Sequence, residues 1–146
     1  MSETWQTKRR IGHHELWYES DTGFIGVVHV GELDKAAAVA WAEYFVTCVK
    51  NSGQPAFVIV DDRKATGMTS EARRIIVDSE LVRSDFHVAG FGMTFTYRAF
   101  INFFSRALAL AGSKVVVKMM SDEAMAREWL TERRRAHLAE RGGAMP

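Results

Sequence analysis

The run Ala56-Phe57-Val58-Ile59-Val60-Asp61-Asp62-Arg63 decides the fold, because an apolar stretch passes directly into charged residues. A short apolar run of this kind is typical of a strand buried on both faces of its sheet. Such strands belong to parallel sheets that are covered by helices. The charged residues then mark the carboxyl end of the predicted strand.

Strands and helices alternate on both sides of this run. The order predicts an α/β domain with a mixed, mostly parallel five-stranded sheet, an N-terminal β-hairpin and four helices. Right-handed crossovers wind such a chain as a βα superhelix. The predicted elements are strands 13–19 and 24–30, a helix over 36–49 capped by Asp34, strand 56–60, a helix capped by Thr69 that reaches Val82, strand 86–95, a helix over 97–111 capped by Thr96, strand 115–119 and a last helix capped by Ser121.

Length and composition indicate one domain with an ordinary surface. The chain has 146 residues, of which 47% are hydrophobic and 25% charged, with a net charge of +1. We expect a flexible arm over residues 1–11, a single domain over 12–140 and a frayed tail over 141–146. The balanced charge predicts no nucleic-acid or membrane-surface partner. A secretory signal and a membrane span are not expected, and the predicted location is cytoplasmic.

Three local features make residues 12–138 resemble a STAS domain, the SpoIIAA-like fold of anti-sigma factor antagonists and sulfate-transporter tails. Phe57-Val-Ile-Val-Asp61 is similar to the family's central strand, which ends in Asp. Thr69-Ser70 lies where the family's phosphorylated Asp-Ser-(Ser/Thr)-Gly motif begins a helix. The stretch from Val115 to Leu130 is similar to the final strand and helix. The long aromatic helix looks more like the divergent branch grouped with CRAL-TRIO-type lipid carriers.

The resemblance implies a function in regulation through a protein partner. Ser70 matches the phosphorylatable serine and is a possible phosphosite, but Thr69 replaces the motif's Asp and Glu71-Ala72 replaces the residues that lead into its Gly. We therefore expect a non-catalytic regulatory module without the complete phosphorylation motif. The alternative is a carrier or sensor that holds an apolar small molecule or lipid beneath the aromatic helix.

A candidate binding crevice lies at the carboxyl ends of the predicted strands, where open α/β sheets usually bind ligands. Helix starts offer free N–H groups to an anion there, and arginines add charge. The alternative is ordinary helix capping, with Asp61 paired to an arginine. The residues of the crevice are Asp61, Asp62, Arg63, Thr66, Thr69, Ser70, Thr94, Thr96, Tyr97 and Arg98.

The sequence does not predict an enzyme or a cofactor. Ser70 has no histidine beside it in the sequence, and the chain has no Gly-x-Ser-x-Gly elbow. Asp61 and Asp62 are neighbours on a strand, so their side chains point apart. Gly90-Phe-Gly92 lacks the third glycine of a dinucleotide fingerprint. An enzyme that uses a crevice between Asp61 and Arg98 is the weakest of the hypotheses.

The predicted hairpin places His14 opposite His29. Two close imidazoles can share a metal, but no third ligand is evident, so two ordinary strand histidines and no metal are expected. The single cysteine, Cys48, excludes an internal disulfide framework.

The aromatic helix is apolar on two faces. Phe103 and Leu110 lie off its main stripe, so this second face needs a cover. A homodimer through Phe103 and Leu110, an apolar ligand, or Trp5 of the N-terminal arm would supply one. The main stripe consists of Tyr97, Phe100, Ile101, Phe104, Leu108 and Ala111.

Overall fold

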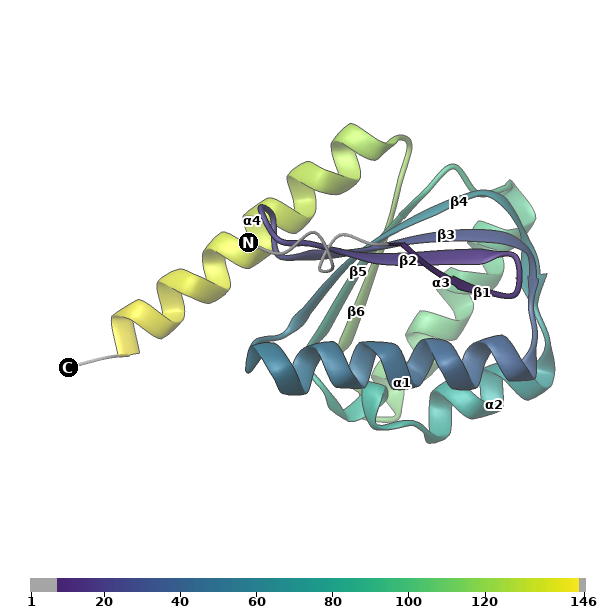
Figure 1. Cartoon of the computed structure of the whole chain (residues 1–146), viewed down its shortest axis with the longest axis horizontal. Helices are drawn as coiled ribbons and strands as arrows, with labels where there is room; N and C mark the ends of the chain where they lie inside the picture. Colours follow the sequence, from purple (N-terminus) through teal and green to yellow (C-terminus); the bar gives the residue numbers. More distant parts are fainter. Residues whose placement is uncertain (1–7, 145–146) are drawn as a thin grey trace.

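The computed structural model describes residues 8–144 of the chain, and the side chains of residues 8–140. Within these residues lie six strands and four α-helices, and from β3 onward strands and helices alternate in the predicted order (Figure 1). The elements are β1 (Arg9–Ile11), β2 (His14–Glu19), β3 (Phe24–Leu33), α1 (Lys35–Ser52), β4 (Ala56–Met68), α2 (Ser70–Asp78), the short 3-10 helix η2 (Glu80–Arg83), β5 (Phe86–Phe91), α3 (Phe95–Leu110), β6 (Val115–Met120) and α4 (Glu123–Ala144).

The strands form one mixed sheet in the order β1-β2-β3-β4-β5-β6. The pairs β1–β2 and β2–β3 are antiparallel, and the three pairs from β3 to β6 are parallel. The α/β class, the mostly parallel sheet, the hairpin and the four helices are confirmed. The sheet has six strands rather than five, because the chain turns at Gly12 and Arg9–Ile11 pairs with β2. The predicted arm over residues 1–11 is therefore wrong for 9–11, whereas Trp5 lies outside the described residues.

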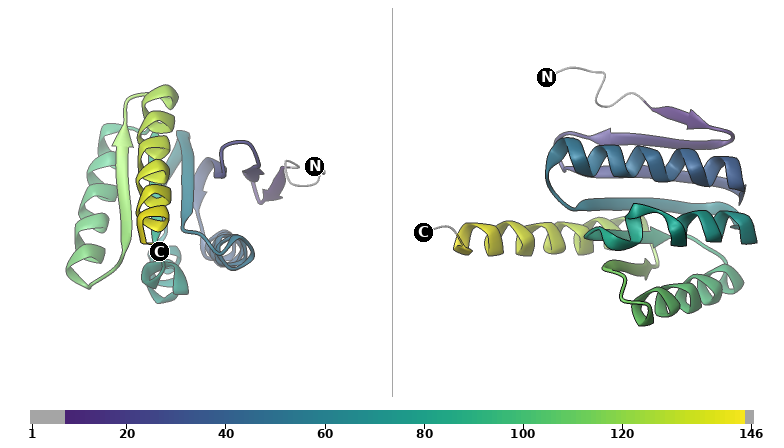
Figure 2. Two further views of the ribbon diagram at one scale, coloured as in Figure 1. Left: turned by 90° about the vertical axis from the view of Figure 1, so that its left-hand side faces the viewer. Right: turned by 90° about the horizontal axis from the view of Figure 1, so that it is seen from below.

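Helices cover both faces of the sheet. The views of Figure 2 show α1, α2 and α3 on one face and α4 on the other. On the first face Trp41 and Phe45 of α1 pack on buried strand residues such as Val58. On the second face Ala126 and Leu130 of α4 pack on Phe24, Phe57, Ile59, Ala89 and Phe91. This double cover explains why residues 56–60 are apolar without alternation.

Strand β4 runs to Met68, well past the end predicted at Val60. It continues because β3 is also long, and Leu33 is still paired with Met68. The pairing shifts register between Val28 and Val30, where β4 has one residue more than β3. The charged residues that follow Val60 therefore lie inside the strand rather than beyond its carboxyl end.

Two helix starts differ from the predicted caps. Helix α3 is capped by Thr94, whose Oγ1 accepts the N–H of Tyr97, and not by Thr96. The strand before it ends early because Gly92 has a φ of 81°, which leaves the extended conformation. Helix α4 is capped by Asp122 rather than Ser121, since the Asp122 carboxylate accepts the N–H of Met125.

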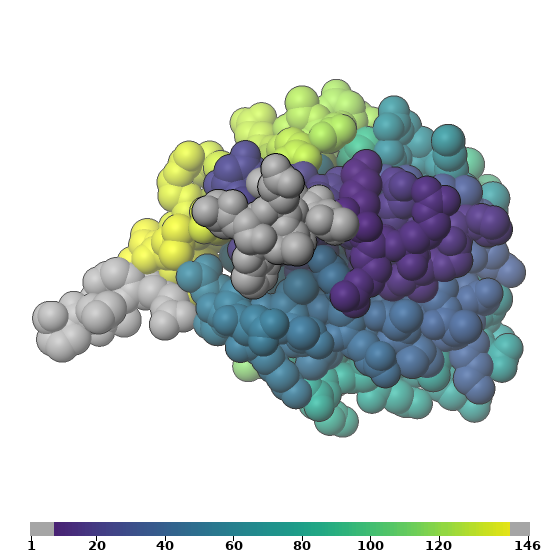
Figure 3. Space-filling view, in the orientation of Figure 1, coloured from purple at the N-terminus to yellow at the C-terminus, as the bar shows by residue number. Residues whose placement is uncertain are grey.

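Two helix ends also differ. Helix α2 ends at Asp78, because Ser79 is extended (ψ 163°) and caps η2 instead. Helix α4 continues through Ala144, beyond the predicted domain end at residue 140. Its second half projects past the body of the molecule (Figures 1 and 3). Residues 145–146 of the predicted tail lie outside the described residues.

Candidate ligand site beneath helix α3

A histidine and an aspartate form a buried pair between β3 and β4. His29 Nδ1 lies 2.9 Å from Asp62 Oδ1. His29 is 6% exposed and Asp62 is 5% exposed. The register shift that follows Val28 places the two side chains beside each other, because β4 has an extra residue at this point. Two groups that normally face water are thus held in the core.

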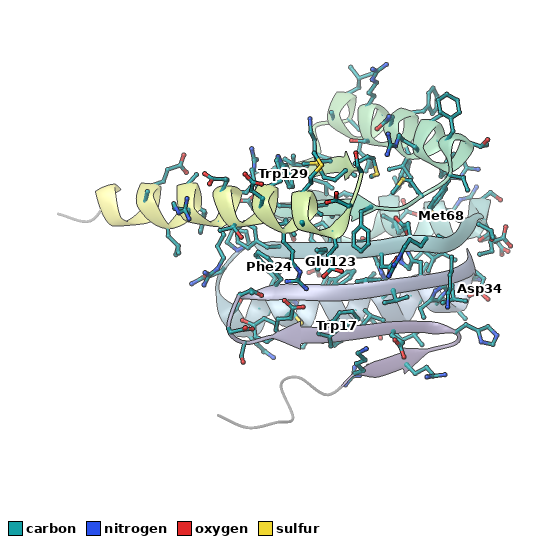
Figure 4. All side chains as sticks on the ribbon, turned by 90° about the horizontal axis from the view of Figure 1, so that it is seen from above. Trp17, Phe24, Asp34, Met68, Glu123 and Trp129 are labelled. Atoms are coloured by element: carbon teal, nitrogen blue, oxygen red, sulfur yellow. The ribbon has the colours of Figure 1, made fainter. Side chains whose placement is uncertain are left out.

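The pair lies at the wall of an apolar cavity of about 90 Å³. The sheet supplies the floor, and α3 supplies the roof with Tyr97, Ile101, Phe104 and Leu108. Met68, at the far end of the molecule from Phe24 in Figure 4, lines it as well. The remaining lining residues are Leu33, Trp41, Val60, Ile76, Leu81, Val82, Phe86, Val88, Gly90, Ser105, Val115, Val117 and Met119.

Gly90 makes room for Asp62 in this wall. A Cβ at Gly90 would lie 3.3 Å from Asp62 Oδ2 and 3.0 Å from Met93 Cε. Both contacts are tighter than most real Cβ contacts. The backbone of Gly90 therefore lies directly beside the buried carboxylate.

Two polar atoms at the cavity have no partner among the described residues. One is His29 Nε2, on the ring edge away from Asp62, and the other is Trp41 Nε1. The rings of His29 and Trp41 have centroids 6.1 Å apart. Buried polar atoms without a partner are uncommon, so each one needs an explanation. Both belong to residues that line the same cavity.

His14 packs edge-on against His29, with ring centroids 5.3 Å apart. The predicted opposition of the two histidines is confirmed. They do not share an acceptor, because His14 Nδ1 accepts the N–H of Val30 while His29 Nδ1 faces Asp62. Burial lowers the pKa of His14, and His29 lowers it further. No group of three His, Cys, Asp or Glu side chains that could hold a metal occurs in the part of the chain that the structure describes.

Tyr97 closes the cavity in the first turn of α3 and is 5% exposed. Burial raises the pKa of its phenol, and the charge of Asp62 raises it further. The phenol therefore keeps its proton at neutral pH and remains a hydrogen-bond donor.

The structure brings only two of the predicted crevice residues, Asp62 and Tyr97, to this cavity. Asp61 points to the other face of the sheet, as strand alternation requires. There it accepts two side-chain hydrogen bonds from Arg63, at 3.0 and 2.7 Å, in the ion pair that was the alternative interpretation. Arg63 holds the pKa of Asp61 below its usual range.

The remaining crevice residues are caps or surface residues. Thr69 and Thr94 cap α2 and α3. Thr66 and Thr96 are exposed, and Arg98 is half-buried, with its Nε unpartnered within the described residues. The predicted crevice is therefore not one site in this structure.

Ser70 lies at a separate surface groove. It is exposed at the start of α2. Because Leu33 pairs with Met68, the starts of α1 and α2 lie side by side, near Asp34 and Met68 in Figure 4. The groove has a volume of about 270 Å³ and is lined by Lys35, Ser70, Glu71, Arg74 and Ile75.

Two solved structures have a similar fold. One is an uncharacterized protein from the DUF3478 family with a SpoIIAA-like fold, from Shewanella loihica PV-4. It is 16% identical, with 79% of this chain and 89% of that chain covered and a TM-score of 0.55. The other is the anti-sigma factor antagonist SpoIIAA in its unphosphorylated form, which is 16% identical, with 84% and 97% covered and a TM-score of 0.52. The chain therefore has the SpoIIAA-like fold that its sequence predicts.

Comparisons of the sequence with protein families and with curated proteins give no match. No protein-family model matches the sequence, and no curated protein is significantly similar to it. Among residues 8–144 no helix combines the length and the apolar character that crossing a membrane requires.

Proposed function

We propose that this SpoIIAA-like domain is a non-catalytic binding module, and that its cavity beneath α3 takes up a small, mostly apolar molecule. One observation carries the proposal: His29 Nε2, in a residue that lines an apolar cavity, is buried without a partner among the described residues. An unsatisfied buried polar atom costs about 1–3 kcal/mol. A ligand that bonds to this nitrogen removes the cost and gains the burial of its own apolar surface.

The surroundings of His29 favour binding over catalysis. Nucleophilic catalysis needs a hydroxyl or thiol within hydrogen-bond reach of the base. His29 has the orienting carboxylate of Asp62, but its Nε2 has no such partner among the described residues. The pair therefore lacks the first member of a catalytic triad.

A titration with toluene tests the proposal. Amide shifts in a ¹H–¹⁵N spectrum are expected to cluster on α3 and on strands β5 and β6 around the cavity. Val117→Phe fills the cavity from β6 and is expected to abolish the response. Val116→Phe is the matched control, because its side chain lies on the other face of β6 and leaves the cavity open. If toluene, phenol and pyridine all fail to bind the wild-type protein at millimolar concentration, the proposal is wrong.

The groove at Ser70 supports a second function, regulation through a protein partner. Ser70 is exposed at a helix start, and Lys35 and Arg74 line the same groove. A phosphate there would add a charge of about −1.5 to −2, which the helix dipole and the two cations would stabilise. Phosphorylation would thus change the charge of a docking surface. This function, like the cytoplasmic location that the sequence predicts, remains a proposal.

Substitution of Ser70 tests the second function. A protein that co-purifies with the wild-type domain is expected to be lost with Ser70→Glu and retained with Ser121→Glu. Ser121 is the control because it is also exposed and also lies just before a helix, α4. A partner that is indifferent to Ser70→Glu would count against the groove as its docking surface.

A further inference from the structure

We propose that the ligand carries a single hydroxyl group, which donates a hydrogen bond to His29 Nε2 and accepts one from Trp41 Nε1. This inference rests on the proposed function and specifies the chemistry of its ligand. It follows from the two orphaned atoms at the cavity, from the charge of the cavity wall and from the volume of the cavity.

Asp62 sets the role of His29 Nε2. An ionised carboxylate only accepts hydrogen bonds, so the Nδ1 atom that faces Asp62 at 2.9 Å carries a proton. In a neutral imidazole the other nitrogen is then a lone-pair acceptor. In this neutral tautomer His29 Nε2 accepts a hydrogen bond, so the ligand has to supply the donor.

Trp41 needs a hydrogen-bond acceptor from the ligand. An indole N–H only donates, and Trp41 Nε1 is buried without an acceptor among the described residues. Its ring lies 6.1 Å from that of His29. A hydroxyl is the smallest organic group that donates one hydrogen bond and accepts another. One hydroxyl oxygen between the rings would satisfy both orphaned atoms.

The charge of the wall excludes an acidic ligand. Among the residues that the structure describes, Asp62 is the acidic residue that lines the cavity, and no lysine or arginine lines it. A carboxylate or phosphate group would meet the like charge of Asp62 in a poorly solvated space, without a cation to offset it. A neutral alcohol or phenol meets no such repulsion.

The volume limits the size of the ligand. An engineered cavity of about 150 Å³ binds benzene. The cavity of about 90 Å³ beneath α3 is smaller, so it accommodates at most a single small ring or a short branched chain. Aromatic and branched side chains on all sides suit such a group. A simple phenol is therefore an appropriate probe.

The experiment compares phenol, toluene and pyridine on the wild-type protein. Toluene has nearly the shape of phenol without the hydroxyl, and pyridine only accepts hydrogen bonds. We expect phenol to bind roughly tenfold more tightly than toluene, the gain expected from one to two net hydrogen bonds. The ¹⁵N resonance of His29 Nε2 is expected to show an unprotonated nitrogen that shifts when phenol binds.

Two variants assign the hydroxyl to its partners. Trp41→Phe keeps an aromatic ring but removes the N–H, so it is expected to reduce the ratio of phenol affinity to toluene affinity. His29→Phe is expected to abolish the preference for phenol. If His29→Phe does not fold, Trp41→Phe and the Nε2 resonance of the wild-type protein still decide the question.

The outcomes separate this inference from the proposed function. If toluene binds in the cavity as tightly as phenol, the cavity proposal stands and the hydroxyl proposal is wrong. If pyridine binds more tightly than phenol, His29 Nε2 is a donor and the hydroxyl proposal is wrong. If none of the three probes binds, both proposals fail.

Discussion

Arg127 of α4 and Glu19 of β2 bind each other through two parallel hydrogen bonds, Nη1 to Oε1 and Nη2 to Oε2, each 2.8 Å long. The side chains are 33% and 15% exposed, so the pair is partly shielded from water. Glu123 of α4 also accepts from Arg127. The pair attaches the start of α4, which Figure 4 shows at Glu123, to the hairpin on its face of the sheet.

Glu19→Gln is expected to lower the free energy of unfolding by about 1–2 kcal/mol, because hydrogen bonds to a charged partner are worth more than neutral ones. Glu132→Gln is the control, since its pair with Arg135 is exposed and should contribute under about 0.5 kcal/mol. Urea unfolding measures both. Equal losses in the two variants would contradict a special role for the pair.

Acid should weaken the same attachment. Hydrogen bonds from Arg127 lower the pKa of Glu19 from 4.5 to about 2. A carboxyl with a lowered pKa contributes stability that is present above its ordinary pKa and is lost as the pH falls through the folded value. We therefore expect the free energy of unfolding of the wild-type protein to decline between pH 4.5 and 2. The free energy of unfolding of Glu19→Gln should decline less over this range.

His87 predicts a second pH dependence at higher pH. Its Nε2 lies 2.7 Å from Asp85 Oδ1, and its Nδ1 accepts from Arg133 Nε at 3.4 Å. Burial lowers the pKa of His87 below 6.5, and that of His14 as well. The unfolded chain therefore binds protons near pH 6 that the folded chain does not, and stability rises with pH up to about 6.5. His87→Gln should flatten this rise in urea titrations, whereas a rise that is unchanged in this variant would contradict the assignment.

We expect the buried pair of His29 and Asp62 to contribute to ligand binding and to add no net stability to the fold. Replacing one partner leaves the other buried and unpaired, so Asp62→Leu is expected to cost about 3–5 kcal/mol. Replacing both with leucine should restore most of that loss, since apolar residues of similar volume often substitute for a buried pair without cost. The double variant should fold but lose its preference for phenol. A double variant as unstable as Asp62→Leu would indicate a structural role.

The predicted homodimer would form through the outer face of α3. Phe103 is 74% exposed and Leu110 is 90% exposed, on the helix face opposite the cavity. Burying such side chains against a second copy would contribute roughly 1.5–3 kcal/mol each. Sedimentation at micromolar concentration should show a dimer that Phe103→Glu converts to a monomer. A wild-type monomer, or a dimer that is insensitive to this change, would reject the prediction.

The order of elements could be predicted because each signal is local. The apolar run before Asp61, the cap at Thr69 and the stripe that begins at Tyr97 depend on neighbouring residues alone. The extra strand could not be predicted, since Arg9–Ile11 has only three residues, two of them arginines, and becomes a strand only by pairing with β2. The length of β4 depends in the same way on the length of β3.

The candidate site was visible only in parts. The sequence predicts His29 opposite His14 and Asp62 in a crevice, but it does not predict that His29 and Asp62 form a pair. Their pairing depends on the register shift after Val28, and a single residue of register decides which side chains meet. No feature of the sequence indicates that the N–H of Trp41 lacks an acceptor among the described residues.

The shortness of β1 affects how copies of this chain can meet. Along the described residues the sheet ends at β1 on one side and at β6 on the other. A free sheet edge can recruit a strand from another molecule and so start open-ended polymers. Strand β1 has only three residues, two of them arginines, and β6 carries the exposed Lys118 in its centre. Two copies that approached through the same edge would bring like charges together, so addition of a strand is disfavoured at both edges.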